Sequence, residues 1–193
     1  MKIHFQNVRI VDLLRTVLTP VWMSLALRRI PTSAPDPIVS DLKEKENMTE
    51  ILLEILKLYG LKEIIGSKHN PQILAMFAEI GYDWVTDDET AWCSAALNYF
   101  CKKLGYERSG KLDARSWLKM PIVVINPQLG DIVILWRNSP TAWEGHVGLY
   151  ISQDIHNIYV LGGNQGNMLS IAPYDKERIL GFRQVRKLKD IKP

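Results

Sequence analysis

The hydrophobic pattern of this 193-residue chain changes character once, near Pro121. Before that point, apolar residues recur at helical spacing in segments that end at glycine. After it, they fall in short runs that are rich in β-branched and aromatic side chains and are separated by turn residues. Helices followed by strands predict an α+β domain in which N-terminal helices pack on one face of an antiparallel sheet.

The expected elements can be placed from capping and turn residues. Capping residues precede the first helix, proline stands at the first turn of the second, and glycine closes the third. Helices are predicted over residues 51–59, 71–80, 90–104 and 112–118. A sheet of about five strands is predicted over residues 132–136, 146–151, 158–161, 168–171 and 179–185.

The charge is concentrated at the N-terminus. Of 24 basic and 21 acidic residues, five basic residues and one acidic residue lie in residues 1–35, so the body of the protein is nearly neutral. A neutral body argues against a broad nucleic-acid-binding face. We expect one body domain over residues 46–190 and an N-terminal extension over residues 1–45.

This extension contains an apolar run at residues 16–27 and three prolines within residues 31–37. The run is shorter than the roughly 20 residues that a membrane-spanning helix needs. Three alternatives stay open: a secretory or export segment, an amphipathic helix that packs on the body or a partner or contacts a membrane, and a loosely ordered extension. The prolines predict a linker after it.

The two cysteines are not expected to form a disulfide. If Cys93 and Cys101 share one helix, they are roughly 12 Å apart along its axis. An intramolecular bridge needs Cα atoms within about 7 Å. The chain also lacks the Cys-x-x-Cys and His-x-x-x-His spacings of zinc sites, so we expect no metal and no cofactor.

Cys93 is the candidate nucleophile. Thr90, or an acidic residue before it, is the expected N-cap of a helix with Cys93 in its first turn. Unpaired backbone N–H groups and the helix dipole there favour a thiolate, which lowers the thiol pKa. The backbone N–H of Cys93 is a candidate oxyanion donor. The alternative is a small buried residue, which we expect for Cys101.

His146 is the candidate base. It opens a predicted strand between Gly145 and Gly148, which leave room for a close neighbour. Taken alone, a histidine in this position is often structural. Together, a thiol at a helix start and an imidazole at a strand start are the two groups that a cysteine hydrolase needs.

A third residue should orient the imidazole. If the hairpin that follows His146 is symmetric about Ile155, position 146 faces position 164, which is asparagine. Directly opposed residues point to the same face of a sheet, so Asn164 could accept a hydrogen bond from the ring. A register slip by one residue would place Gln165 or Gly163 there instead.

Several segments together carry a family resemblance. The ordered motifs are Leu61-Lys62-Glu63-Ile64-Ile65-Gly66, Thr90-Ala91-Trp92-Cys93-Ser94-Ala95, Ala114-Arg115-Ser116-Trp117-Leu118, Gly130-Asp131-Ile132-Val133, Gly145-His146-Val147-Gly148 and Leu161-Gly162-Gly163-Asn164-Gln165. Over about residues 50–185 the chain resembles the NlpC-type and CHAP cysteine peptidase/amidase superfamily. More narrowly, it is similar to a bacterial and phage subfamily of CHAP-like peptidoglycan hydrolases.

The resemblance implies a papain-like α+β fold and hydrolysis of an amide bond in peptidoglycan at the cell envelope, in the periplasm or after export. The nucleophile carries over to Cys93, the base to His146 and the third position to Asn164. The chain departs from the pattern in two ways. No acidic residue lies on the strand after His146, and Ala91 stands where subfamily members often have proline.

Four residues are candidates for binding substrate. They are Trp92, Gln165, Trp117 and Trp143, although the tryptophans are equally suited to the core or the rim of the domain. Peptidoglycan is the expected partner, and an immunity protein or secretion partner is left open. Two other functions are weighed against a peptidoglycan amidase or endopeptidase: a protease or transferase of the same fold that acts on protein, and a non-catalytic wall-binding module.

Overall fold

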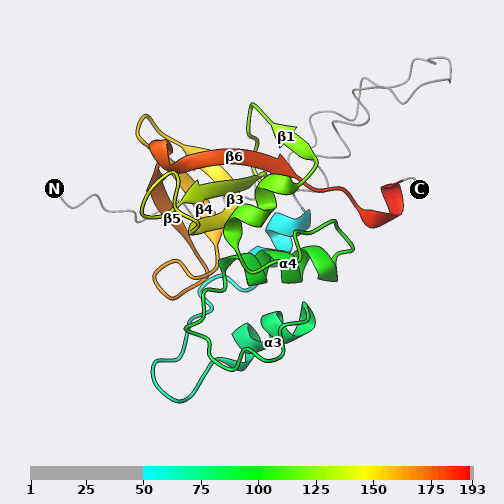
Figure 1. Cartoon of the computed structure of the whole chain (residues 1–193), viewed down its shortest axis with the longest axis vertical. Coiled ribbons are helices and arrows are strands. Elements are labelled where there is room, and N and C mark those ends of the chain that lie inside the picture. The colour runs from blue at the N-terminus through cyan, green and yellow to red at the C-terminus, as the bar shows by residue number, and fades with distance from the viewer. Residues whose placement is uncertain (1–49, 192–193) are drawn as a thin grey trace. The chain divides into compact units, whose positions relative to one another are not determined.

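The structure is a computed structural model that describes residues 50–191 (Figure 1). These residues fall within one compact unit, Pro37–Pro193. The predictions for residues 1–45, including the apolar run and the proline-rich linker, lie outside the described residues. No helix among residues 50–191 has the length and apolar character that crossing a membrane requires.

A six-stranded antiparallel sheet forms the centre of the domain, which is therefore an α+β domain as predicted. Its strands lie in the order β1-β6-β2-β3-β4-β5. They are β1 (Ile122–Val124), β2 (Ile132–Trp136), β3 (Gly145–Gln153), β4 (Asn157–Gly162), β5 (Ser170–Asp175) and β6 (Ile179–Gln184). The prediction of about five strands missed β1, an edge strand of three residues that is too short to show an alternating pattern.

The α-helices precede the sheet in the chain. The helical segments comprise residues 50–56, α3 (Pro71–Glu79), α4 (Cys93–Lys103) and the 3-10 helix η1 (Ala114–Lys119); two shorter 3-10 turns, η2 (Lys176–Arg178) and η3 (Leu188–Asp190), flank β6. Helix α3 starts at Pro71, as predicted, and the Asn70 side chain caps it by accepting from the backbone N–H of Gln72. Asp113 caps η1 in the same way through Ser116.

The helices are layered on one side of the sheet. Helix α4 packs against β3, and α3 packs against the far side of α4 (Figure 1). The buried face of α4 includes Leu97, Phe100 and Cys101, and the full burial of Cys101 confirms its expected place in the core. A second apolar cluster is formed by sheet residues Val133, Leu135, Tyr150, Ile158 and Val160.

Candidate active site

Cys93 is the first residue of α4, three residues later than the predicted start at Thr90. The N-cap is Trp92, with φ −111° and ψ 9°, and no side chain caps the helix. The prediction of a cap at Thr90 or an acidic residue is therefore wrong. Asp87 accepts instead from the backbone N–H of Glu89, and Asp88 from that of Ile64. The backbone N–H groups at the start of α4, next to Cys93, therefore have no capping side chain.

The Cys93 thiol is buried against strand β3. It is 6% exposed, and burial raises its pKa above the ordinary value, although the backbone N–H groups of Val147 and Ser94 act in the opposite direction. The expected lowering of the thiol pKa by the helix end is not found, because desolvation of a thiolate outweighs the helix N–H groups. At rest the group is a neutral thiol.

His146 is the second residue of β3 and is also buried, at 4% exposure. Its ring stacks on Tyr174 with the centroids 5.2 Å apart and the planes 25° from parallel. Burial lowers the pKa of His146 to about 4, a hydrogen bond to Gln165 opposes this, and the charges of Arg137 and Arg178 lower it further. The resting imidazole is therefore neutral.

Gln165 fixes the tautomer of that imidazole. Its Nε2 group donates to the main-chain oxygens of Val160 and Ser170, so its Oε1 atom is the one that faces the ring. That oxygen lies 3.0 Å from Nε2 of His146 and can only accept, so Nε2 carries the ring proton. The lone pair is then on Nδ1, which has no hydrogen-bond partner among residues 50–191. The contact with Gln165 thus orients the ring so that Nδ1 can act as a base.

The predicted partner Asn164 does not contact the imidazole. The symmetric register is correct near the site, where Leu149 pairs with Leu161 and Tyr150 with Val160, but β4 ends at Gly162. Asn164 then adopts a left-handed conformation with φ 58°, and its Nδ2 donates to Oε1 of Glu63 at 2.6 Å. This turn brings the next residue, Gln165, back to His146.

Three of the four predicted substrate-binding residues are buried, and one of them, Gln165, is the hydrogen-bond partner of His146. Trp92 and Trp117 are fully inaccessible, and their indole N–H groups donate to Glu63 and Ser94. These two predictions are wrong, because a ring with no exposed surface cannot line a cleft. Trp143 is 75% exposed in the loop before β3 and can contact a ligand.

Three residues near the site were missed by sequence reasoning. Tyr174 covers the His146 ring, and the charge of Arg137 acts on both Cys93 and His146. Glu63 accepts hydrogen bonds from Trp92 and Asn164, the residues that directly precede Cys93 and Gln165. None has a local pattern that marks it, although Glu63 lies within a motif of the resemblance.

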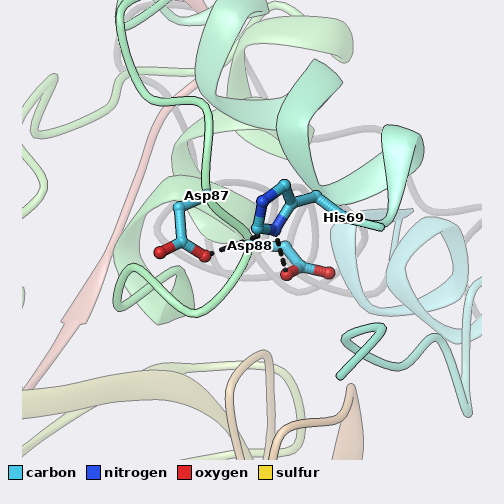
Figure 2. Close-up of side chains that lie close together, drawn as sticks. All are labelled: His69, Asp87 and Asp88. Carbon is cyan, nitrogen blue, oxygen red and sulfur yellow. Dashed lines mark hydrogen bonds and ion pairs between the residues drawn. The ribbon is translucent and has the colours of Figure 1, made fainter. Parts of the chain in front are cut away.

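A separate cluster of His69, Asp87 and Asp88 could hold a metal ion (Figure 2). One ligand atom from each residue lies within 4.8 Å of the others. Nδ1 of His69 is 3.1 Å from Asp88 and 3.4 Å from Asp87. The fully buried Asp88 also accepts from the backbone N–H groups of Ile64 and Asn70, and these bonds together hold its pKa below the ordinary value despite burial. Hydrogen bonds thus account for the cluster.

A cavity of about 330 Å³ lies at η1 and the segment after α4. Its lining carries four cationic side chains: Arg108, Lys111, Arg115 and Lys119. Neither Cys93 nor His146 lines it. Since both of those residues are almost fully buried, access of a substrate to them requires the surrounding side chains to move.

No protein-family model matches the chain, and no curated protein was found that matches it. A function for this protein therefore rests on the arrangement of Cys93, His146 and Gln165.

Proposed function

We propose that this protein is a cysteine hydrolase with a papain-like fold of the NlpC/CHAP type, and that Cys93, His146 and Gln165 carry the reaction. The observation that supports this most strongly is the Gln165 amide, which leaves the Nδ1 lone pair of His146 free. Val147, the next residue of β3, meets the Cys93 thiol through its backbone N–H. The strand that carries the oriented base thus also reaches the thiol through the residue after His146, which supports their pairing in one reaction.

The proposed reaction is a double displacement. Nδ1 of His146 takes the thiol proton as Sγ of Cys93 bonds to the carbonyl carbon, which forms a tetrahedral intermediate. The C–N bond then breaks, and the imidazolium returns the proton to the leaving amine. Water, deprotonated by the same nitrogen, hydrolyses the thioester and releases the acid and the free thiol.

The neutral resting state decides the timing of the first step. Burial raises the pKa of Cys93 and lowers that of His146, so an ion pair is disfavoured before substrate binds. Proton transfer therefore accompanies attack on the carbonyl. The backbone N–H groups at the start of α4, which no side chain caps, include that of Cys93 and are the candidate donors to the oxyanion.

Peptidoglycan is the proposed substrate class, as an N-acetylmuramoyl–alanine amide or a stem-peptide bond. The motifs that resemble the CHAP-like subfamily support this choice, and so does an exposed Trp143 in the loop that leads to His146. A protease or transferase that acts on protein would use the same three residues. An oriented base, followed in β3 by the residue whose backbone N–H acts on the Cys93 thiol, favours either enzyme over a binding module.

Purified peptidoglycan and the full chain test the proposal. The wild type should release fragments, and mass spectrometry of these fragments identifies the bond that is cut. The Cys93→Ala and His146→Ala variants, checked for folding by circular dichroism, should release none above background. A wild type that releases no fragments would overturn the peptidoglycan substrate. Full activity in Cys93→Ala would overturn the mechanism for any substrate.

A further inference from the structure

Glu63 lies outside the three proposed catalytic residues, but its carboxylate connects the two sides of their site. Its Oε1 atom accepts from the indole Nε1 of Trp92 at 2.7 Å and from Nδ2 of Asn164 at 2.6 Å. Trp92 directly precedes Cys93, and Asn164 directly precedes Gln165. One oxygen atom thus joins the neighbour of the nucleophile to the neighbour of the residue that orients the base.

The segment that carries Glu63 is itself fixed on both sides. The backbone N–H of Glu63 donates to the oxygen of Asn167, and the N–H of Leu169 donates to the oxygen of Leu61. On the other side, the buried carboxylate of Asp88 accepts from the N–H of Ile64. The Glu63 side chain therefore starts from a backbone that the 167–169 segment and Asp88 hold in place.

The two donors are also packed against each other. A methyl group at Gly163 would lie 2.4 Å from Cζ3 of Trp92, so the backbone between Gly162 and Asn164 rests directly on the indole ring. This ring has no exposed surface. A shift of the Asn164–Gln165 turn would move against Trp92, and the Glu63 carboxylate is the polar group that holds the turn and the ring together.

We propose that Glu63 is a positioning residue that sets the distance between the Cys93 thiol and the imidazole held by Gln165. This inference rests on the proposed cysteine hydrolase function. Hydrogen bonds that a carboxylate accepts are stronger than those between neutral groups, and one carboxylate oxygen can accept two. A glutamine at position 63 keeps an oxygen acceptor of the same reach, whereas alanine removes it.

The first measurement is steady-state hydrolysis by the wild type, Glu63→Ala and Glu63→Gln. Because misplacement of reacting groups by about 1 Å can lower a rate by about 100-fold, Glu63→Ala should lower kcat by about 10- to 100-fold with little change in KM. Glu63→Gln should retain most of the wild-type kcat. Trp92→Phe and Asn164→Gly each remove one donor, and combining either with Glu63→Ala should lower kcat no further.

Glu107→Ala is the matched control. Glu107 is also a part-buried carboxylate that accepts from another segment, through the backbone and guanidinium N–H groups of Arg186, but it follows the opposite end of α4. Its removal should lower stability and leave kcat unchanged. If Glu63→Ala lowers kcat no more than Glu107→Ala does, or if Glu63→Gln is as impaired as Glu63→Ala, Glu63 is only structural.

Alkylation of Cys93 by chloroacetamide gives a reading that needs no substrate. The ratio of the alkylation rate with His146 to the rate in His146→Ala measures assistance by the imidazole. This ratio should exceed one in the otherwise wild-type protein and should fall towards one when both rates are measured in the Glu63→Ala background. Alkylation of the buried Cys101 should stay slow in every variant, because faster labelling would indicate general opening. If the wild type gives a ratio above one but hydrolyses no peptidoglycan, only the proposed substrate is refuted. If the ratio is unchanged in the Glu63→Ala background, the positioning role is refuted.

Discussion

Nε2 of His146 lies 3.0 Å from Oε1 of Gln165, and the Gln165 amide cannot be reversed without placing its oxygen against two main-chain oxygens. Both groups are buried, so this orientation does not depend on solvent. The relationship determines which ring nitrogen is protonated. It therefore determines which nitrogen can receive a proton from Cys93.

Replacing Gln165 with alanine should lower kcat by about 100-fold, because the ring loses both its orientation and its preferred tautomer. The KM should change less, since the side chain is buried. Steady-state kinetics on peptidoglycan fragments measure both constants. Unchanged kcat in a folded Gln165→Ala protein would contradict the assigned role.

Gln165→Glu should change the pH dependence as well as the rate. A carboxylate beside the ring favours the imidazolium, so the pKa of His146 should rise above its value of about 4. Since the neutral ring is the base, the acid limb of the pH–rate profile should move to higher pH. The glutamate also loses the donors to Val160 and Ser170, so this variant should unfold at lower denaturant concentration than the wild type. An acid limb that does not move would contradict direct contact between the two side chains.

The burial of neutral His146 predicts a stability that depends on pH. In the unfolded chain the ring takes a proton near pH 6.5, but in the folded protein it does so only near pH 4. The unfolded state thus binds more protons between these values, so stability should fall as the pH falls from 6.5 to 4, by about 3 kcal/mol from this residue. Urea unfolding at both pH values measures the loss. The loss should be smaller in His146→Gln, where no group titrates, and an equal loss in both proteins would count against the assignment.

The charge of Arg137 should affect the pKa values of both Cys93 and His146. Its guanidinium lowers the pKa of Cys93 and of His146, since a positive charge favours the thiolate and disfavours the imidazolium. Arg137→Gln should therefore raise both values. The acid limb of hydrolysis should move to higher pH, and alkylation of Cys93 should need a higher pH than in the wild type. Shifts in opposite directions would show that the effect is not the loss of a single positive charge.

The sequence was sufficient to predict the α+β class and most strands, and it singled out Cys93 and His146 as candidates. Those features depend on local patterns, such as the β-branched run of β2, and on a hairpin register that holds at Leu149 and Tyr150. The third residue was assigned wrongly, because the turn after Gly162 depends on a bond from Asn164 to Glu63, 101 positions away in the chain. Local patterns carry no information about such a contact.

Burial was the other source of error. Trp92 and Trp117 stand in the motifs of the resemblance, but their large rings are fully buried in the core, where they donate to Glu63 and Ser94. Cys93 is buried as well, and its burial raises the thiol pKa, whereas the helix end was expected to lower it. Whether a residue at a helix start is desolvated depends on what packs over it, and here that is β3, which begins more than 40 residues later in the chain.

The close approach of Gly163 to Trp92 gives a prediction about stability. A Cβ at position 163 would lie 2.4 Å from Cζ3 and 2.5 Å from Cε3 of an indole that is fully buried and hydrogen-bonded to Glu63. The ring cannot move away without losing that bond, so Gly163→Ala should destabilise the fold by about 1–3 kcal/mol. Chemical denaturation measures this change. In a Trp92→Leu background the smaller side chain leaves space, so the same substitution should have a much smaller effect, and additive effects in the double variant would show that the two residues do not interact.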